Sequence, residues 1–328
     1  MKWGILSTGT IANKFAATVN MMLNEGEALQ AVASRDLTKA EQFAVTYEIP
    51  QAYGSYEELL CDPEVEAVYI ATPNNLHYQH TKMCLEAGKH VLCEKPFTTS
   101  AKDARELYQL AEERNLFVME GFWIRFLPLY ETLLPMIHSK KWGELRHARV
   151  EYGFIAEGQR RTRKFVSELG GGALLDIGIY NLGFLYMVMG HSPKTYTSTV
   201  RFNEFGTDEF SVLQLQYPGD KTAHSLQAIG LKTDRNAALF FDRAVVYLPD
   251  FQSATSFTVE PVGEAPYEVK CPMEINGFEY EIREVTRCVS EGKSHSEIFR
   301  PEDSLAVLEL MDEIRASWDM KFSFEEGK

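Results

Sequence analysis

The first 120 residues alternate short apolar runs with stretches whose apolar side chains recur at helical spacing. The runs WGILS, ALQAVAS, VEAVYIAT, HVLCE and LFVME are typical of strands. Ile11, Phe15, Val19 and Met22 form one helical stripe. Alternation of this kind predicts an α/β domain with a doubly wound parallel sheet over residues 1–120. In such sheets, ligands bind at the carboxyl ends of the strands.

The pattern changes after residue 120, because strand-like runs then follow one another mostly without helices between them. The run LQLQY alternates apolar and polar positions, which indicates a sheet covered on one face. We predict a second, α+β domain over 121–328 with a large open, mostly antiparallel sheet. Helices are expected near 173–189, 276–291 and 302–317, and the last two could pack back on the first domain.

Charge and cysteine usage exclude several classes of partner. The net charge of -14 argues against nucleic acid or an anionic membrane. The five cysteines form no C-x-x-C pair, so we predict no metal site and a reducing, cytoplasmic location. The start of the chain becomes polar too quickly for a secretory signal. The longest apolar stretch contains Asp176 and is expected to be a buried helix.

A glycine-containing turn follows the first predicted strand and opens the first predicted helix. Its sequence, STGTIA, resembles the dinucleotide fingerprint G-x-G-x-x-G/A, with serine in place of the first glycine. Amides at the helix N-terminus would bind the pyrophosphate. The alternative is a tight turn with no ligand. The residues we assign to this cofactor loop are Ser7, Thr8, Gly9, Thr10 and Ile11.

The end of the second predicted strand bears on the choice of cofactor. An NAD site usually has an acidic residue there, but this chain has Ser34 followed by Arg35. A guanidinium beside a hydroxyl suits the 2′-phosphate of NADP. We therefore predict NADP, with NAD possible. The alternative is a solvated Arg35 paired with Asp36.

Two further strand ends carry polar residues. The segment IATPNNLH places Thr72, Asn74 and His77 where they could contact the nicotinamide ribose, although Asn74 could cap the next helix and His77 could be structural. The segment VLCEKPF ends the next strand with Glu94 and Lys95. A lysine beside a cationic nicotinamide could take a proton from an alcohol as hydride leaves its carbon. A solvated surface pair is the alternative.

A second polar cluster lies in the segment GGGALLDIGIY. Asp176 and Tyr180 are four residues apart, which predicts that both lie on one helical face. Because their neighbours are apolar, a buried polar pair favours a functional site. Tyr180 could transfer a proton and Asp176 could orient it or a substrate hydroxyl. The alternative is a capping aspartate and a core tyrosine.

These motifs together resemble the glucose–fructose oxidoreductase / inositol dehydrogenase (Gfo/Idh/MocA) family over nearly the whole chain. The segments WGILSTGTIA, AVASRDL, LCEKPF, EGFWIRFLP and GGGALLDIGIY look closest to the branch of dimeric dihydrodiol dehydrogenase and NADP-dependent D-xylose 1-dehydrogenase. The resemblance implies a Rossmann domain, Lys95 at the nicotinamide, and Tyr180 as the proton-transfer residue. Many members have histidine at the position of Tyr180, which leaves open whether Lys95 or Tyr180 is the base.

The same resemblance implies a substrate pocket. Trp123, Arg125 and Phe154 fall where that branch lines it, and Trp123 could stack on a sugar or an aromatic diol. Arg163 lies in the polar run EGQRRTRK, which could be a lid or solvated surface.

We therefore expect an NADP-dependent oxidoreductase that moves a hydride between nicotinamide and a secondary alcohol or lactol carbon of a sugar, polyol or trans-dihydrodiol. The alternative is a non-catalytic NAD(P)-binding sensor of the same fold. We also expect a homodimer formed by the outer face of the C-terminal sheet. Either Leu213, Leu215 and Tyr217, or Phe210 and Val212, would point outward there.

Overall fold

The computed structural model describes residues 1–325, and the side chains of all of these except 159 and 160. The chain forms two compact units, of which the first contains residues 1–123 and 274–302 and the second residues 124–273 and those from 303 onward. Helix α9 (Phe278–Ser290) therefore belongs to the first unit, and nearly all of α10 (Pro301–Ser317) belongs to the second.

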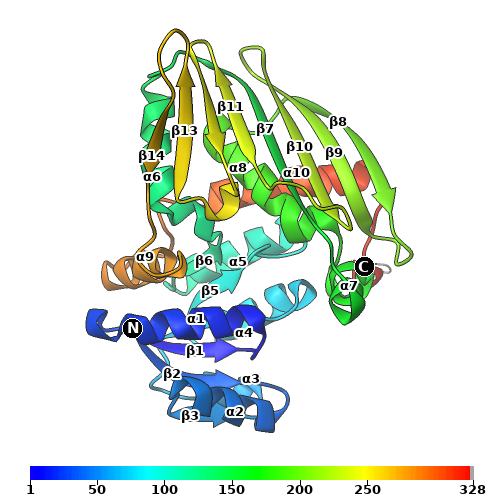
Figure 1. The fold of residues 1–328 in the computed structure, drawn as a ribbon. Helices are drawn as coiled ribbons and strands as arrows, with labels where there is room; N and C mark the ends of the chain where they lie inside the picture. The colour runs from blue at the N-terminus through cyan, green and yellow to red at the C-terminus, as the bar shows by residue number, and fades with distance from the viewer. Residues whose placement is uncertain (326–328) are drawn as a thin grey trace. The chain divides into compact units, whose positions relative to one another are not determined.

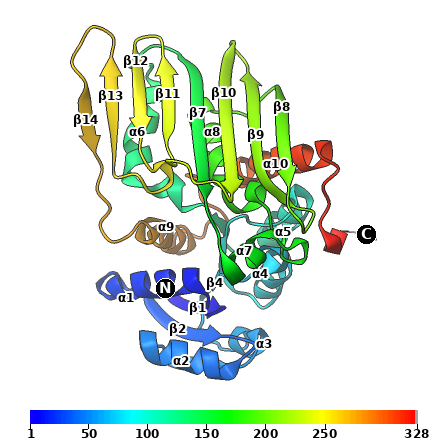
Figure 2. The ribbon, with the colours of Figure 1, turned by 45° about the vertical axis from the view of Figure 1, so that its right-hand side comes forward.

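The first unit contains a six-stranded sheet in the order β3-β2-β1-β4-β5-β6, in which every neighbouring pair is parallel. The strands are β1 (Lys2–Leu6), β2 (Ala28–Ala33), β3 (Gln51–Tyr53), β4 (Ala67–Ile70), β5 (His90–Glu94) and β6 (Val118–Gly121). The helices between them are α1 (Thr10–Met21), α2 (Leu37–Tyr47), α3 (Tyr56–Leu60), α4 (His77–Glu86) and α5 (Ala101–Glu113). Helices α1 and α2 pack against each other, because the Tyr47 hydroxyl of α2 donates to the Asn13 Oδ1 of α1 at 2.9 Å, and α1 lies beside β1 (Figures 1 and 2).

The strand order reverses between β1 and β4, which is the switch point where doubly wound sheets bind ligands. Aromatic rings pack the core next to it. The rings of Phe15 and Tyr69 stack at a centroid distance of 3.8 Å, and Trp3 meets Phe15 edge-on at 5.3 Å. Phe15 of the apolar stripe on the first helix thus packs onto the first and fourth strands.

The second unit contains an eight-stranded sheet in the order β14-β13-β12-β11-β7-β10-β9-β8. Its strands are β7 (Leu145–Phe154), β8 (Thr195–Phe202), β9 (Asp208–Tyr217), β10 (Lys221–Ile229), β11 (Ala237–Phe241), β12 (Ala244–Leu248), β13 (Ser256–Pro261) and β14 (Tyr267–Lys270). All neighbours are antiparallel except β7 and β10, which run parallel. The short, polar β14 was not predicted, because YEVK has too few apolar positions to show an alternating pattern.

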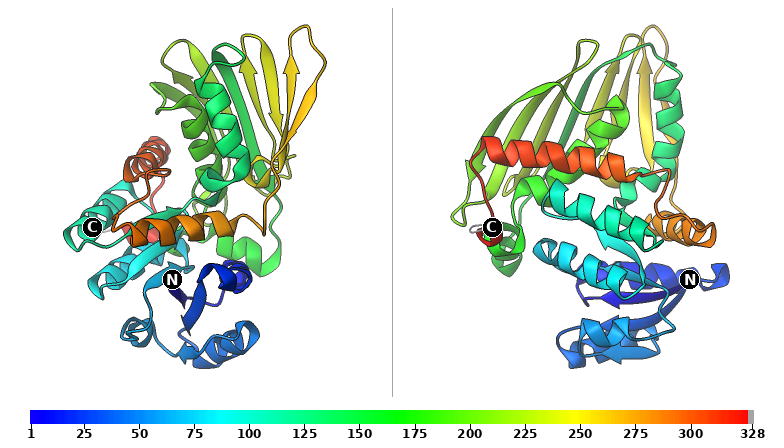
Figure 3. Two further views of the ribbon diagram at one scale, coloured as in Figure 1. Left: turned by 90° about the vertical axis from the view of Figure 1, so that its left-hand side faces the viewer. Right: turned by 180° about the vertical axis from the view of Figure 1, so that it is seen from behind.

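Helices cover one face of this sheet (Figure 3). They are α6 (Pro128–His138), α8 (Ile179–Met189) and α10, and the first of these was not predicted. Leu213 and Leu215 are 0 % and 1 % exposed, so their set points to the covered face. Phe210 and Val212 alternate with them and are half-buried on the other face. The segment Ser167–Met189 is long and apolar enough to cross a membrane, but 83% of its most apolar window is buried inside the protein.

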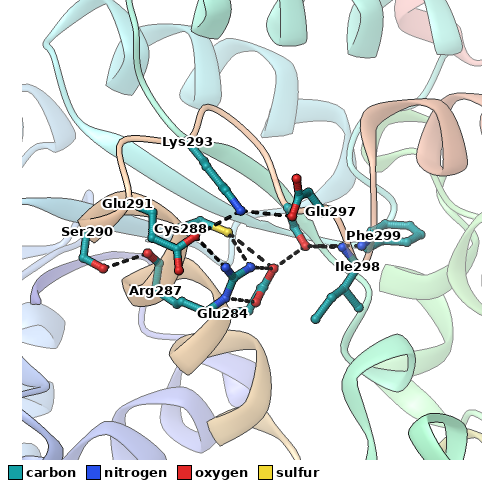
Figure 4. Close-up of polar contacts among 10 residues, drawn as sticks. Glu284, Arg287, Cys288, Ser290, Glu291, Lys293, Glu297, Ile298 and Phe299 are labelled. Atoms are coloured by element: carbon teal, nitrogen blue, oxygen red, sulfur yellow. Dashed lines mark hydrogen bonds and ion pairs between the residues drawn. The ribbon is translucent and has the colours of Figure 1, made fainter.

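A network of charges fixes the loop that follows α9 (Figure 4). Arg287 joins Glu284 at 2.9 Å and Glu291 at 2.7 Å. Lys293 joins Glu291 and Glu297, both at 3.0 Å. The cluster is partly exposed and ties the loop back to its own helix, so we assign it a structural role.

Candidate active site

The cofactor loop adopts the backbone conformation that the missing glycine would take. Ser7 has a φ of 95°, in the region that favours glycine, so serine here carries strain. Its amide donates to the Ala33 carbonyl at 3.0 Å, and its Oγ accepts from the Gly9 amide at 3.3 Å. The serine side chain therefore offsets part of the strain by closing the turn itself.

Gly9 precedes α1 and leaves room for a ligand. A Cβ at this position would have only the Ser7 Oγ within 4 Å, at 3.6 Å. Helix α1 has no side-chain cap at its N-terminus. Amides at such a helix end attract an anion. The loop therefore has the open glycine and uncapped helix start that a pyrophosphate site needs, and the predicted residues Thr8, Thr10 and Ile11 lie in it.

At the end of β2, Asp36 has partners other than Arg35, which was the alternative to a cofactor role for the arginine. Asp36 instead caps α2 by accepting from the Lys39 amide at 3.4 Å, and its carboxylate pairs with the Lys39 ammonium at 3.6 Å. Arg35 is exposed, and it forms no ion pair within residues 1–325. Its guanidinium is therefore available to a ligand phosphate. The Ser34 Oγ lies in the same turn and accepts from the Asp36 amide at 3.3 Å.

Two histidines fix the strand ends around Lys95. His77 is 1 % exposed, and its ring nitrogens lie 2.8 Å from the Pro96 carbonyl and 2.8 Å from the Thr72 carbonyl. Burial, with a smaller effect of the Lys95 charge, lowers the pKa of His77. His80, which was not predicted, contacts the Thr72 Oγ1 at 2.9 Å, and burial lowers its pKa to about 4. His77 thus joins the β4 end to the turn after β5, and His80 holds the Thr72 side chain at the β4 end.

The turn that carries Lys95 is held on both sides. Glu94 is 9 % exposed and accepts from the Tyr69 hydroxyl, and burial raises its pKa. The Lys95–Pro96 peptide bond is cis. The Phe97 amide donates to Glu120 at 3.0 Å. Lys95 is half-buried at the carboxyl end of β5, so it lies at the edge of the sheet where Rossmann domains bind the nicotinamide.

Trp123 is part of a cation–π cluster that the sequence did not reveal. Its ring lies 5.6 Å from the ring of Phe278, and the Lys14 ammonium lies 4.6 Å from both ring centroids. Burial lowers the pKa of Lys14, and Glu281 and Glu94 oppose that effect. Glu281 is 0 % exposed, and burial raises its pKa well above the ordinary value. Local spacing could not predict this group, because it joins α1 to a helix more than 250 residues later in the chain.

In the second unit, the glycine-rich turn is shaped by close backbone contacts. A Cβ on Gly171 would lie 2.7 Å from the Lys164 carbonyl oxygen. Gly172 has a φ of 115°, and a Cβ there would lie 2.3 Å from the Asp208 carboxylate. Asp208 accepts from the Leu174 amide at 2.7 Å. These contacts explain the glycines and fix the start of the π-helical turn η5 (Leu174–Gly178).

Asp176 lies in η5 and Tyr180 in the first turn of α8. The Lys164 ammonium, at the end of α7 (Gly158–Phe165), lies 2.5 Å from the Asp176 carboxylate. Tyr152 of β7 lies near both predicted residues. Its ring centroid is 6.0 Å from that of Tyr180, and the charge of Asp176 contributes to the raised pKa of its hydroxyl. Burial, with a smaller effect of Asp176, raises the pKa of Tyr152 to about 12. Neither Tyr152 nor Lys164 was predicted.

The remaining predicted residues have less specific surroundings. Phe154 packs at the margin of an apolar cluster that contains Phe165 and Ile177. Asn74 and Arg125 are half-buried in 3-10 turns, and Arg163 is exposed on α7. The first unit therefore gathers the cofactor residues and Lys95 at one sheet edge, and the second gathers Asp176 and Tyr180 around Tyr152.

Comparison with known proteins places both halves of the chain in one family. Residues 1–122 match the model of an oxidoreductase family with an NAD-binding Rossmann fold, and residues 130–239 match the GFO/IDH/MocA C-terminal domain. No metal-binding group of three or more His, Cys, Asp or Glu occurs among the residues that the structure describes.

Curated relatives match over almost their whole length. The chain is 38% identical over 320 residues to trans-1,2-dihydrobenzene-1,2-diol dehydrogenase of Xenopus tropicalis, which covers 95% of this chain and 96% of that protein. It is 34% identical to the Homo sapiens enzyme of the same name, with 98% of each chain covered.

Solved structures of similar fold include a 3-ketoreductase from Actinomadura kijaniata in complex with NADP and TDP-benzene. Its TM-score is 0.87 at 25% identity, with 96% of this chain and 97% of that chain covered. The aldose-aldose oxidoreductase of Caulobacter crescentus has a TM-score of 0.86 at 24% identity, with coverage of 97% and 98%, and shares the fold. With both domains matched and relatives aligned end to end, the chain belongs to the GFO/IDH/MocA family of NAD-binding oxidoreductases.

Proposed function

We propose that this chain is an NADP-dependent dehydrogenase that acts on CH–OH groups of a sugar, polyol or trans-diol. The position of Lys95 at the carboxyl end of β5 supports this proposal most. Contacts of the Pro96 carbonyl with His77 and of the Phe97 amide with Glu120 hold its turn in place, and the family match is to NAD-binding oxidoreductases. The curated relatives named above are dihydrodiol dehydrogenases, which supports an alcohol carbon as the reacting centre.

The cofactor preference follows from the residues at two strand ends. The cofactor loop around Gly9 suits a pyrophosphate, as described above, and the unpaired, exposed Arg35 suits a 2′-phosphate. When bound, the nicotinamide would supply or accept the hydride. The related 3-ketoreductase was solved with NADP, which supports the same choice here.

Chain residues would move the proton and position the alcohol. Lys95 and Tyr180 are the proposed acid–base groups, since each can exchange a proton with a hydroxyl. Asp176, paired with Lys164, would accept a hydrogen bond from a substrate hydroxyl and orient it. Trp123, Arg125, Phe154 and Arg163 complete the proposed substrate residues.

We further propose a cytoplasmic homodimer that associates through the uncovered face of the eight-stranded sheet. All five cysteines are free, which suits a reducing compartment. Val212 and Leu226 are register partners on that face and are both half-buried, so an apolar area lies in the middle of a mostly polar surface. A self-complementary contact would cover it.

The test is a substrate panel of aldoses, polyols and trans-diols with NADP⁺ and NAD⁺, followed by the absorbance of the reduced cofactor. We expect turnover with at least one substrate and a preference for NADP⁺. Binding of NADP without turnover of any substrate would instead support the sensor.

A further inference from the structure

Lys164 and Asp176 form an ion pair within the second unit. The Lys164 ammonium lies 2.5 Å from the Asp176 carboxylate, and the two side chains are 30% and 11% exposed. A charge-assisted hydrogen bond between partly buried side chains is stronger than one between neutral groups. Asp176 is the residue that we propose to orient the substrate hydroxyl.

The backbone around Lys164 is held against the turn that carries Asp176. The Gly172 amide donates to the Lys164 carbonyl at 2.8 Å, and the Asp176 amide donates to the Gly172 carbonyl at 3.1 Å. Phe165, the next residue, is 0 % exposed and packs with Ile177. Hydrogen bonds through Gly172 therefore fix the backbone of Lys164 relative to the backbone of Asp176.

The other described basic residues of α7 differ from Lys164. Arg161 pairs with Glu204, and Arg163 is exposed. Groups that face η5 from other elements include Lys164 of α7, Tyr152 of β7 and Asp208 of β9. Of these three, only Lys164 brings a positive charge to the Asp176 carboxylate.

We propose that Lys164 is a positioning residue for the reaction, which keeps the Asp176 carboxylate ionised and fixes the direction in which it accepts a substrate hydroxyl. The proposal rests on the proposed function, because it gives Lys164 a purpose only if Asp176 binds substrate. An ionised carboxylate accepts hydrogen bonds, whereas a protonated one also donates, so loss of the cation changes what the substrate meets. Misplacement of a positioning group by about 1 Å can lower the rate by about 10²-fold.

The test compares Lys164→Met, which keeps the aliphatic stem, with Lys164→Arg, which keeps the charge. We expect Lys164→Met to lower kcat/KM by about 10- to 100-fold and to move the acidic limb of its pH profile to higher pH. Lys164→Arg should restore much of the loss and the original acidic limb. Arg161→Met is the matched control: it removes an ion pair from the same helix, and we expect kcat/KM within about two-fold of wild type, as for an exposed pair.

A double-mutant cycle with Asp176→Asn separates positioning from general stability. If Lys164 acts through Asp176, Lys164→Met should add little to the loss already caused by Asp176→Asn. Full additivity of the two losses, or a wild-type pH profile in Lys164→Met, would overturn the inference about Lys164. If Asp176→Asn is nevertheless impaired, the proposed function still stands. A fully active Asp176→Asn would overturn both this inference and the proposed role of Asp176. Should Lys164→Met not fold, Lys164→Gln replaces it in the same cycle.

Discussion

Arg35 is exposed at the end of β2, while the neighbouring Asp36 is occupied by the α2 cap and Lys39. Arg35→Ala should therefore weaken NADP binding and leave NAD binding nearly unchanged, because only NADP carries the 2′-phosphate. A charge-assisted contact contributes roughly 1.5–3 kcal/mol, or about one to two decades in affinity. Fluorescence titration with both cofactors measures it. Lys39→Ala, at the third residue of α2, is the control. Equal losses of affinity for both cofactors in Arg35→Ala would make the arginine structural.

The proton chemistry can be divided between Lys95 and Tyr180 by two substitutions. Lys95→Met should lower turnover by about 10²-fold or more, as expected for the loss of a positioned acid–base group. Cofactor affinity should change less. Tyr180→Phe keeps the ring beside Tyr152 and removes only the hydroxyl, so the rate should fall and the basic limb of the pH profile should shift if that hydroxyl exchanges the proton.

Steady-state rates over a pH series distinguish the outcomes. Lys102→Met removes an exposed lysine from the first turn of α5 and controls for loss of charge alone. A fully active Tyr180→Phe would assign the base to Lys95, and near-wild-type turnover in Lys95→Met would sink the catalytic role of the lysine.

At the scale of elements, the π-helical turn η5 depends on the buried Asp208. Burial raises the pKa of Asp208 to about 7, above its ordinary value of 3.8, although the carboxylate accepts from the Leu174 amide. The folded state therefore holds a proton that the unfolded state has lost between about pH 4 and pH 7. Stability must fall as pH rises through that window, by up to roughly 4 kcal/mol if the whole shift counts.

Asp208→Asn should remove this pH dependence, because the side-chain amide keeps a carbonyl that can accept from Leu174 and has no proton to lose. We expect wild type to lose stability relative to the variant between about pH 4 and pH 7, measured by thermal unfolding. Asp242→Asn is a control of opposite sign, since hydrogen bonding to Arg146 lowers the pKa of Asp242. Parallel pH profiles for wild type and Asp208→Asn would contradict the prediction.

At the scale of the whole molecule, the uncovered face of the eight-stranded sheet is the proposed dimer interface. Its helix-covered face is apolar, whereas the opposite face combines threonine, glutamine and charged side chains with Val212 and Leu226. Leu226→Glu should dissociate the proposed dimer, because a carboxylate buried in a two-fold contact meets its own copy or an apolar surface. Light scattering at micromolar concentration measures the mass.

The matched control is Val45→Glu, which charges an apolar side chain that is 82% exposed on α2 of the first unit. It should leave the dimer and NADP binding unchanged. A monomer mass for the wild-type chain would refute the proposal, as would a Leu226→Glu variant that remains a dimer.

Much of this molecule follows from patterns between residues close together in the chain. Apolar spacing predicted the Rossmann strands except the three-residue β3, together with the helix through Asp176 and Tyr180. The strand-end residues from Gly9 to Lys95 followed from those strands. These inferences hold because a strand end, a glycine turn or a helical face is determined by neighbours within a few residues. The resemblance to the family added the substrate residues Trp123 and Phe154.

Tertiary structure alone decided the contacts that join distant segments. The parallel pairing of β7 with β10, the cap that Asp208 provides to Leu174, and the ion pair between Lys164 and Asp176 have no local signature. The burial of Asp208 and the 2.5 Å distance between the Lys164 ammonium and the Asp176 carboxylate depend on where the backbone places these residues. The packing of the whole sheet and its helices determines that placement. The residues of the candidate site could therefore be predicted from the sequence, whereas their contacts, burial and charge states are determined by the tertiary structure.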